Sequence, residues 1–238
     1  MNGTHTLPSR PAASVWRSLA AGMRDILPVV PSVAAYALVF GMLARQKQLS
    51  LTEISAMSGL VFAGSSQFIA LGLWTTPLPL GAIVGAVLII NLRYVFICAS
   101  CRPLFAGANR LPAFAAMFFV ADENWAMTMG RRAQGAEAGA MHLVGGGVLL
   151  YLVWVLSSIM GDAAGTLMPD PARWGLDFTF AAAFLALLTG MWRGRSDLFP
   201  WGIAAVCAIA ASRLLPGNWY IILGGLAGSI SGVLLRAD

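Results

Sequence analysis

Long apolar stretches fill most of this chain, and short polar loops separate them. Of the 238 residues, 58% are hydrophobic and 11% are charged, whereas roughly 25% of the residues of a soluble domain are charged. The apolar stretches cover residues 26–45, 54–74, 80–101, 112–129, 140–160, 178–192, 198–213 and 219–235. This pattern indicates an integral membrane protein.

Helices are the expected element of every stretch, because only helices and closed barrels satisfy all backbone polar groups in hydrocarbon. The stretches lack the two-residue alternation of barrel strands. The sequence therefore predicts an all-α polytopic membrane protein, a bundle of seven to eight transmembrane helices. The second stretch is expected to be broken or re-entrant, because Gly59 and Gly64 weaken a helix where Gln67 also needs polar partners.

The chain divides into a short arm and one membrane domain. Residues 1–25 hold three arginines and two prolines and are expected to form a polar N-terminal arm. Residues 26–238 then form a single transmembrane transport domain, because no polar segment is long enough to fold separately in water. The net charge is +5, but the 15 basic residues are spread over the loops. They are expected to set the membrane topology rather than to bind nucleic acid.

Polar residues inside the apolar stretches mark the candidate functional positions, because a charge at the bilayer centre costs about 3 kcal/mol or more. They fall into three groups along the chain. The groups are Gly64, Ser65, Ser66 and Gln67; Asn91 and Arg93; and Asp122, Glu123 and Asn124. The first group can unwind a helix and offer backbone amides to the carboxylate of a zwitterion. Its alternative role is an interhelical polar clamp.

The charged groups predict an ion pair within the membrane. Arg93 lies too deep in its stretch to reach the interface comfortably, so it needs a carboxylate, helix C-terminal carbonyls or a bound anion, and Asp122 or Glu123 is the available counter-ion. Asn91 and Arg93 lie about 200° apart on an ideal helix and cannot share one cavity without distortion. Asp122 and Glu123 are expected near the middle of their stretch, where a carboxylate carries a proton or belongs to a structural ion pair.

The sequence predicts no enzyme, cofactor or metal site. Cys98 and Cys101 have redox-pair spacing, but they close an apolar helix, and no second Cys or His pair completes a zinc site. The chain also lacks a phosphate-binding loop. His142 begins an apolar stretch, and nothing in its spacing from Ser65 or Ser66 implies a nucleophile and base. A position at the membrane interface accounts for His142.

Two motifs of small residues predict close helix contacts. They are Gly81-x-x-x-Gly85 and Gly224-x-x-x-Gly228, and each creates a smooth face on which another helix can approach closely. Either face is a candidate contact for a partner subunit.

Several motifs together resemble those of a known family. In chain order they are the run from Met57 to Phe68, Asn91-Leu92-Arg93, Asp122-Glu123 and Leu176-Asp177-Phe178. They resemble the AzlC family, the large subunit of branched-chain amino acid exporters, over roughly residues 20–235. The resemblance implies secondary active export of branched-chain amino acids, and of related ones such as methionine, coupled to the proton gradient across a bacterial inner membrane. It also implies a separately encoded small membrane subunit of the AzlD type.

The resemblance also assigns roles to the polar residues. It makes Gly64, Ser65, Ser66, Gln67, Asn91 and Arg93 the substrate-binding residues, and Asp122 and Glu123 the proton-coupling residues. Asp177 matches the acid of the last motif, although a helix N-cap explains it equally well.

Two other functional classes stay open. A channel or scramblase-like pore would move small solutes without depending on a proton gradient. A non-transporting assembly or sensor subunit would tolerate the loss of these polar side chains.

Overall fold

The described part of this chain is built entirely from helices and their connections. The computed structural model describes residues 12–167, 194–215 and 219–234, and these ranges contain no strand. The all-helical prediction is confirmed for them. The predicted stretch at 178–192 and the Leu-Asp-Phe motif around Asp177 lie outside the described residues.

Four helical stretches in the described ranges are long and apolar enough to cross a membrane. They are Ser14–Gln46, Leu80–Phe105, Ala140–Thr166 and Arg195–Leu214. Large apolar side chains on one of them, those of Leu80, Val84 and Leu88, are more than half exposed, as expected of a surface that faces lipid. The total of seven to eight spans stays a prediction.

The chain forms two compact units. The first comprises Met1–Ala63 and Arg93–Leu167, and the second comprises Gly64–Leu92 and Met168–Asp238. The predicted division into a polar arm at 1–25 and one transport domain at 26–238 stays a prediction. The described part of the arm is helical from Ala12 onward and belongs to the first unit.

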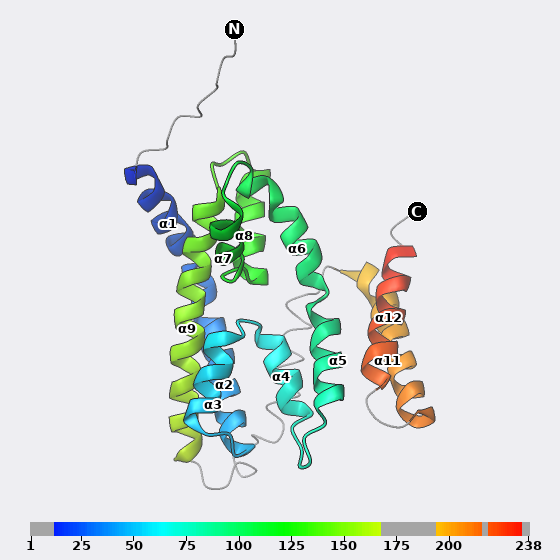
Figure 1. Ribbon diagram of the computed structural model, residues 1–238. Helices are drawn as coiled ribbons and strands as arrows, with labels where there is room; N and C mark the ends of the chain where they lie inside the picture. Colours follow the sequence, from blue (N-terminus) through cyan, green and yellow to red (C-terminus); the bar gives the residue numbers. More distant parts are fainter. Residues whose placement is uncertain (1–11, 168–193, 216–218, 235–238) are drawn as a thin grey trace. The chain divides into compact units, whose positions relative to one another are not determined.

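The first unit is organised around one long helix, α9 (Figure 1). Three N-terminal helices, α1, α2 and α3, pack against it, and α8 contacts both α1 and α9. Prolines shape the passage from α1 to α2, since Pro28 lies in the 3-10 turn η1 and Pro31 lies in the first turn of α2. The bounds are α1 Ala12–Ile26, η1 Leu27–Val29, α2 Val30–Gln46, α3 Leu51–Leu60, α6 Arg93–Cys101, η2 Arg102–Phe105, α7 Arg110–Met117, α8 Asp122–Ala133 and α9 Ala140–Thr166.

Glycines allow the N-terminal helices to touch the backbone of α9. A Cβ atom at Gly22 of α1 would collide with the carbonyl oxygen of His142, and one at Gly41 of α2 would collide with that of Ser158. From the other side, Gly161 of α9 faces the carbonyl oxygen of Leu38. Small residues permit such close approach between membrane helices, so these contacts fix α1 and α2 on α9.

The second unit contains two helix pairs among its described residues. They are α4 Gly64–Gly72 with α5 Leu80–Asn91, and α11 Leu198–Leu214 with α12 Trp219–Leu234, the latter pair preceded by η4 Arg195–Asp197. Gly224 of α12 packs on Ala208 of α11, where an added Cβ would lie 2.8 Å from the alanine Cβ. By contrast, a Cβ at Gly81 of α5 would meet no other element of the described residues within 4 Å. The two predicted smooth faces therefore differ, because α11 already occupies one of them.

One residue from each of the three candidate groups begins a helix. Gly64 opens α4 after the non-helical residues 61–63, Arg93 opens α6, and Asp122 opens α8 after an interruption at residues 118–121. The stretch predicted at 112–129 is therefore not one continuous helix, and Asp122 and Glu123 lie at a helix start; their position near the middle of the membrane stays a prediction. The break at residues 61–63 falls inside the stretch predicted to be broken or re-entrant, and re-entry into the membrane stays a prediction.

Candidate functional site

The polar side chains that follow Gly64 are buried in the second unit. Ser65, Ser66 and Gln67 lie in the first turn of α4, and none of them is more than 7% exposed. The hydroxyl of Ser66 donates a hydrogen bond of 2.8 Å to Oδ1 of Asn91, the last residue of α5. The structure thus brings two predicted binding residues together. Their bond is also the interhelical clamp considered as the alternative role.

Arg93 and Asp122 form an ion pair in the first unit. Nη1 of Arg93 lies 2.9 Å from Oδ2 of Asp122, and both side chains are partly exposed. The guanidinium carbon also lies 5.4 Å from the centre of the Tyr94 ring, a cation–π distance. Asp122 opens α8, where the helix dipole favours a negative charge. The ion pair that the sequence predicts is present.

Glu123 has a different environment from its neighbour. Its side chain is exposed, and adjacent positions on a helix diverge by about 100°. The ion pair with Arg93 belongs to Asp122. Of the two predicted carboxylates, the structure therefore singles out Asp122 as the partner of the arginine.

Asn124 is a structural residue that holds the start of α8. Its Oδ1 accepts a bond of 2.7 Å from the backbone N–H of Ala121, which closes the first turn of the helix. Its Nδ2 donates to the carbonyl oxygens of Phe119 at 2.9 Å and Leu143 at 2.8 Å. The side chain is 1% exposed. Asn124 therefore connects the residues before α8 to α9.

A buried cluster around His142 escaped the sequence analysis. The imidazole is 2% exposed, and its Nε2 lies 2.8 Å from Oδ2 of Asp25 on α1. The same carboxylate oxygen is 2.9 Å from Nη1 of Arg131 on α8. Nδ1 of His142 lies 3.0 Å from Oγ1 of Thr128, also on α8. The side chain of His142 is thus enclosed by three helices and has polar partners on two of them, and its position at the membrane interface stays a prediction.

One sequence signal points to this cluster in retrospect. Asn124, Thr128 and Arg131 follow the spacing of a single helix face, four and then three residues apart. That polar face of α8 is turned toward α9 and α1. The partners His142 and Asp25 come from distant parts of the sequence, so only the fold joins them.

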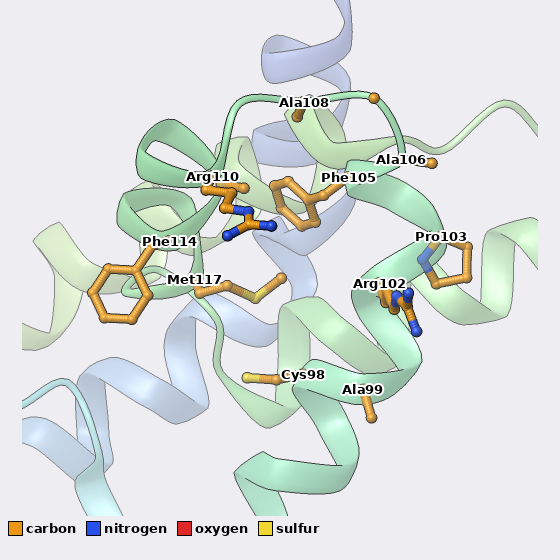
Figure 2. Close-up of a pocket in the computed structure, with 12 residues that line it drawn as sticks. Cys98, Ala99, Arg102, Pro103, Phe105, Ala106, Ala108, Arg110, Phe114 and Met117 are labelled. Carbon is orange, nitrogen blue, oxygen red and sulfur yellow. The ribbon is translucent and has the colours of Figure 1, made fainter.

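A surface pocket of the first unit contains none of the predicted site residues. It is formed by the end of α6, by η2 and by α7, and Figure 2 shows its lining. Two arginines, Arg102 and Arg110, border it together with apolar side chains such as Phe105 and Met117. It is therefore distinct from the predicted substrate site.

The fold and these polar groups define a class of protein: a polytopic α-helical membrane protein with polar residues at helix starts within apolar sequence. The chain belongs to the AzlC family. The family described as "AzlC protein" matches residues 28–168, which include both the Ser66–Asn91 and the Arg93–Asp122 pairs.

Three relatives align with most of the chain. It is 22% identical to the branched-chain amino acid transport protein AzlC of Bacillus subtilis, over 93% of this chain and 86% of the relative. It is 23% identical to an uncharacterized membrane protein of Haemophilus influenzae, over 81% and 84%, and 32% identical to one of Archaeoglobus fulgidus, over 73% and 76%. No solved structure matches the chain at a significant level.

Proposed function

We propose that this chain exports valine, leucine and isoleucine, and also methionine, as the large subunit of a proton-coupled secondary transporter in the bacterial inner membrane. Membership of the AzlC family and a relative named as a branched-chain amino acid transport protein support the substrate class. The observation that carries the mechanism is the ion pair between Arg93 and Asp122.

An ion pair of this kind matches both charges of an amino acid. When the pair opens, Arg93 can bind the substrate carboxylate through paired hydrogen bonds, and Asp122 can bind the substrate ammonium. A proton on Asp122 removes the negative charge that the ammonium needs. Proton and amino acid then compete for the same carboxylate, which is the condition for exchanging one against the other. Glu123, exposed beside Asp122, is the second candidate to carry the proton.

The start of α4 supplies a second group of residues for substrate binding. Gly64 permits the chain to leave helical geometry, and the positive end of the α4 dipole lies at this helix start, where it favours a substrate carboxylate. Ser65, Ser66 and Gln67 add buried hydroxyl and amide groups. We assign the role of substrate binding to these residues and to Asn91.

The small AzlD-type subunit is the proposed partner. The face of α5 at Gly81 and Gly85 supports a helix contact, since among the described residues no atom of another element lies within 4 Å of a Cβ placed at either glycine. Gly224 and Gly228 are less suitable, because they already pack on α11.

Efflux measurements test the proposal. Bacterial cells expressing the chain, with and without the small subunit, are loaded with dipeptides, and release of labelled valine, leucine, isoleucine and methionine is followed before and after an uncoupler. Faster release that the uncoupler suppresses is expected. Faster release that the uncoupler does not change would instead indicate a pore. Unchanged release, with the protein shown to be in the membrane, would indicate an assembly or sensor subunit.

A further inference from the structure

The cluster of Asp25, Thr128, Arg131 and His142 has no role in the exchange described above. We propose that it is a second proton-binding site, in which His142 takes the proton and α8 carries the effect toward Asp122. The proton binding stands by itself, and its link to transport rests on the proposed function.

The charges of the cluster leave His142 as the group that changes its protonation. Arginine stays protonated at any physiological pH. Arg131 therefore compensates the charge of Asp25 permanently, through the contact of 2.9 Å. Histidine is the side chain whose charge ordinarily changes between about pH 5 and pH 8. Since Nε2 of His142 faces the carboxylate of Asp25, an added positive charge on the ring has an anion beside it.

Thr128 allows the ring to gain or lose a proton without losing a hydrogen bond. When His142 is neutral with its proton on Nε2, Nδ1 accepts from the hydroxyl of Thr128. When His142 is charged, Nδ1 carries a proton and donates to the same hydroxyl oxygen. A hydroxyl serves both states because it is donor and acceptor. An aliphatic side chain in its place would leave either state with an unpaired buried nitrogen.

The surrounding helices hold the cluster in place, and within the described part of the chain no further ion pair joins it. Gly22, one turn before Asp25, lets α1 touch the backbone of His142 itself. Next to the histidine, Leu143 belongs to an apolar group that includes Met117 of α7. Arg24 of α1 is exposed. The charged groups that face the imidazole are therefore Asp25 from α1 and Arg131 from α8.

Protonation of His142 has a direct consequence for α8. His142 and Arg131 share one oxygen of Asp25, so a second positive charge weakens the attraction that ties Arg131 to α1. Arg131 and Thr128 lie on the same helix that begins with Asp122. A change in how α8 is held thus reaches the carboxylate that pairs with Arg93.

Proton binding can be tested without transport. The chain has two histidines, so a His5→Gln background leaves His142 as the only one. The full chain, labelled with 15N-histidine and placed in lipid nanodiscs, is titrated by NMR. The expected result is a reversible change of the His142 ring signals between those of a neutral tautomer and those of the charged ring as the pH is varied over the range in which the chain stays folded. Ring signals that stay those of one protonation state throughout this range would overturn the proposal.

Thr128 variants test the hydroxyl and its link to transport. In Thr128→Val the ring loses the hydroxyl that pairs with Nδ1 in both protonation states, so the midpoint of the change in the ring signals is expected to move. Thr128→Ser keeps the hydroxyl and is expected to keep the midpoint. Where efflux is measurable, its pH profile is expected to shift with the midpoint in Thr128→Val. A shifted midpoint with an unshifted efflux profile would overturn the link to transport. A midpoint that does not change in Thr128→Val would overturn the role of Thr128. Both results can be told apart from a complete lack of efflux, which bears on the proposed function instead.

Discussion

The hydroxyl of Ser66 donates a hydrogen bond of 2.8 Å to the side-chain oxygen of Asn91, and this bond joins the first turn of α4 to the last residue of α5. Ser66 is 1% exposed, so neither water nor lipid headgroups could easily pair with its hydroxyl if the Asn91 side chain were removed. In this family member the same contact is both an interhelical clamp and part of the proposed substrate site.

We expect Ser66→Ala to lower the stability of the purified chain by about 0.6 kcal/mol, the usual size of such a bond between membrane helices. Asn91→Ala should have a similar effect, and the double variant should be no worse than the worse single one. Thermal unfolding in detergent measures this cycle. The exposed Ser229→Ala provides the control. Fully additive losses would contradict a direct contact.

Asp122→Asn should abolish coupled export. The neutral amide can neither take a proton nor hold an ammonium, so uncoupler-sensitive efflux should fall at least about tenfold, equivalent to about 1.4 kcal/mol. Efflux from dipeptide-loaded cells measures the effect. The exposed Glu137→Gln serves as the charge-matched control. Unchanged, uncoupler-sensitive efflux in Asp122→Asn would remove Asp122 from the coupling mechanism.

Glu123→Gln separates the two adjacent carboxylates. Of the two carboxylates, Asp122 forms the ion pair with Arg93, so we expect Glu123→Gln to impair efflux less than Asp122→Asn does. The same assay compares both variants at equal expression. The reverse order would assign the proton to Glu123 and a structural role to the ion pair.

The positions of the charged residues could be predicted from sequence more readily than their surroundings. Arg93 deep in an apolar stretch requires an anion, and Asp122 supplies it. Hydropathy could not show that α7 stops at Met117, because residues 118–121 are as apolar as the residues before them. It therefore placed the carboxylates inside one continuous stretch rather than at a helix start.

The His142 cluster shows a second limit of sequence reasoning. Its members come from α1, α8 and α9, and no spacing rule connects Asp25 with His142. The contact depends on Gly22 and Gly145, which let α1 and α9 approach until their backbones touch. A single histidine in an apolar sequence thus has its partners defined by helix packing alone.

Gly41→Ala should destabilise the first unit. The added methyl group would meet the carbonyl oxygen of Ser158 on α9, and α2 cannot withdraw without losing its other contacts. We expect a loss of about 1–3 kcal/mol, typical of overpacking. Gly202→Ala, in a helix with open space around the site, is the matched control and should be neutral or slightly stabilising. Equal thermal stability of both variants would contradict the packing of α2 on α9.

Gly81→Leu and Gly224→Leu should fail in different ways. Gly81 faces open space, so its leucine variant should fold normally but lose co-purification with the small subunit. Gly224 packs on Ala208, so its leucine variant should instead separate α12 from α11 and lower the stability of the chain itself. Size-exclusion chromatography of the tagged complex measures both. A stable Gly81→Leu chain that keeps its partner would place the subunit contact elsewhere.

Asn124→Asp tests whether the start of α8 depends on the hydrogen-bond donor of the Asn124 side chain or only on the size and shape of that side chain. The two side chains have nearly the same size, but an ionised aspartate would turn a negative oxygen toward the carbonyl oxygens of Phe119 and Leu143, which now accept at 2.9 and 2.8 Å. We therefore expect Asn124→Asp to be less stable than Asn124→Ala, which only leaves the carbonyls unpaired at a cost of about 1–3 kcal/mol. Thermal unfolding of the two variants at neutral pH gives the comparison. If Asn124→Asp were the more stable of the two, the amide bonds to α9 would not be what holds α8 in place.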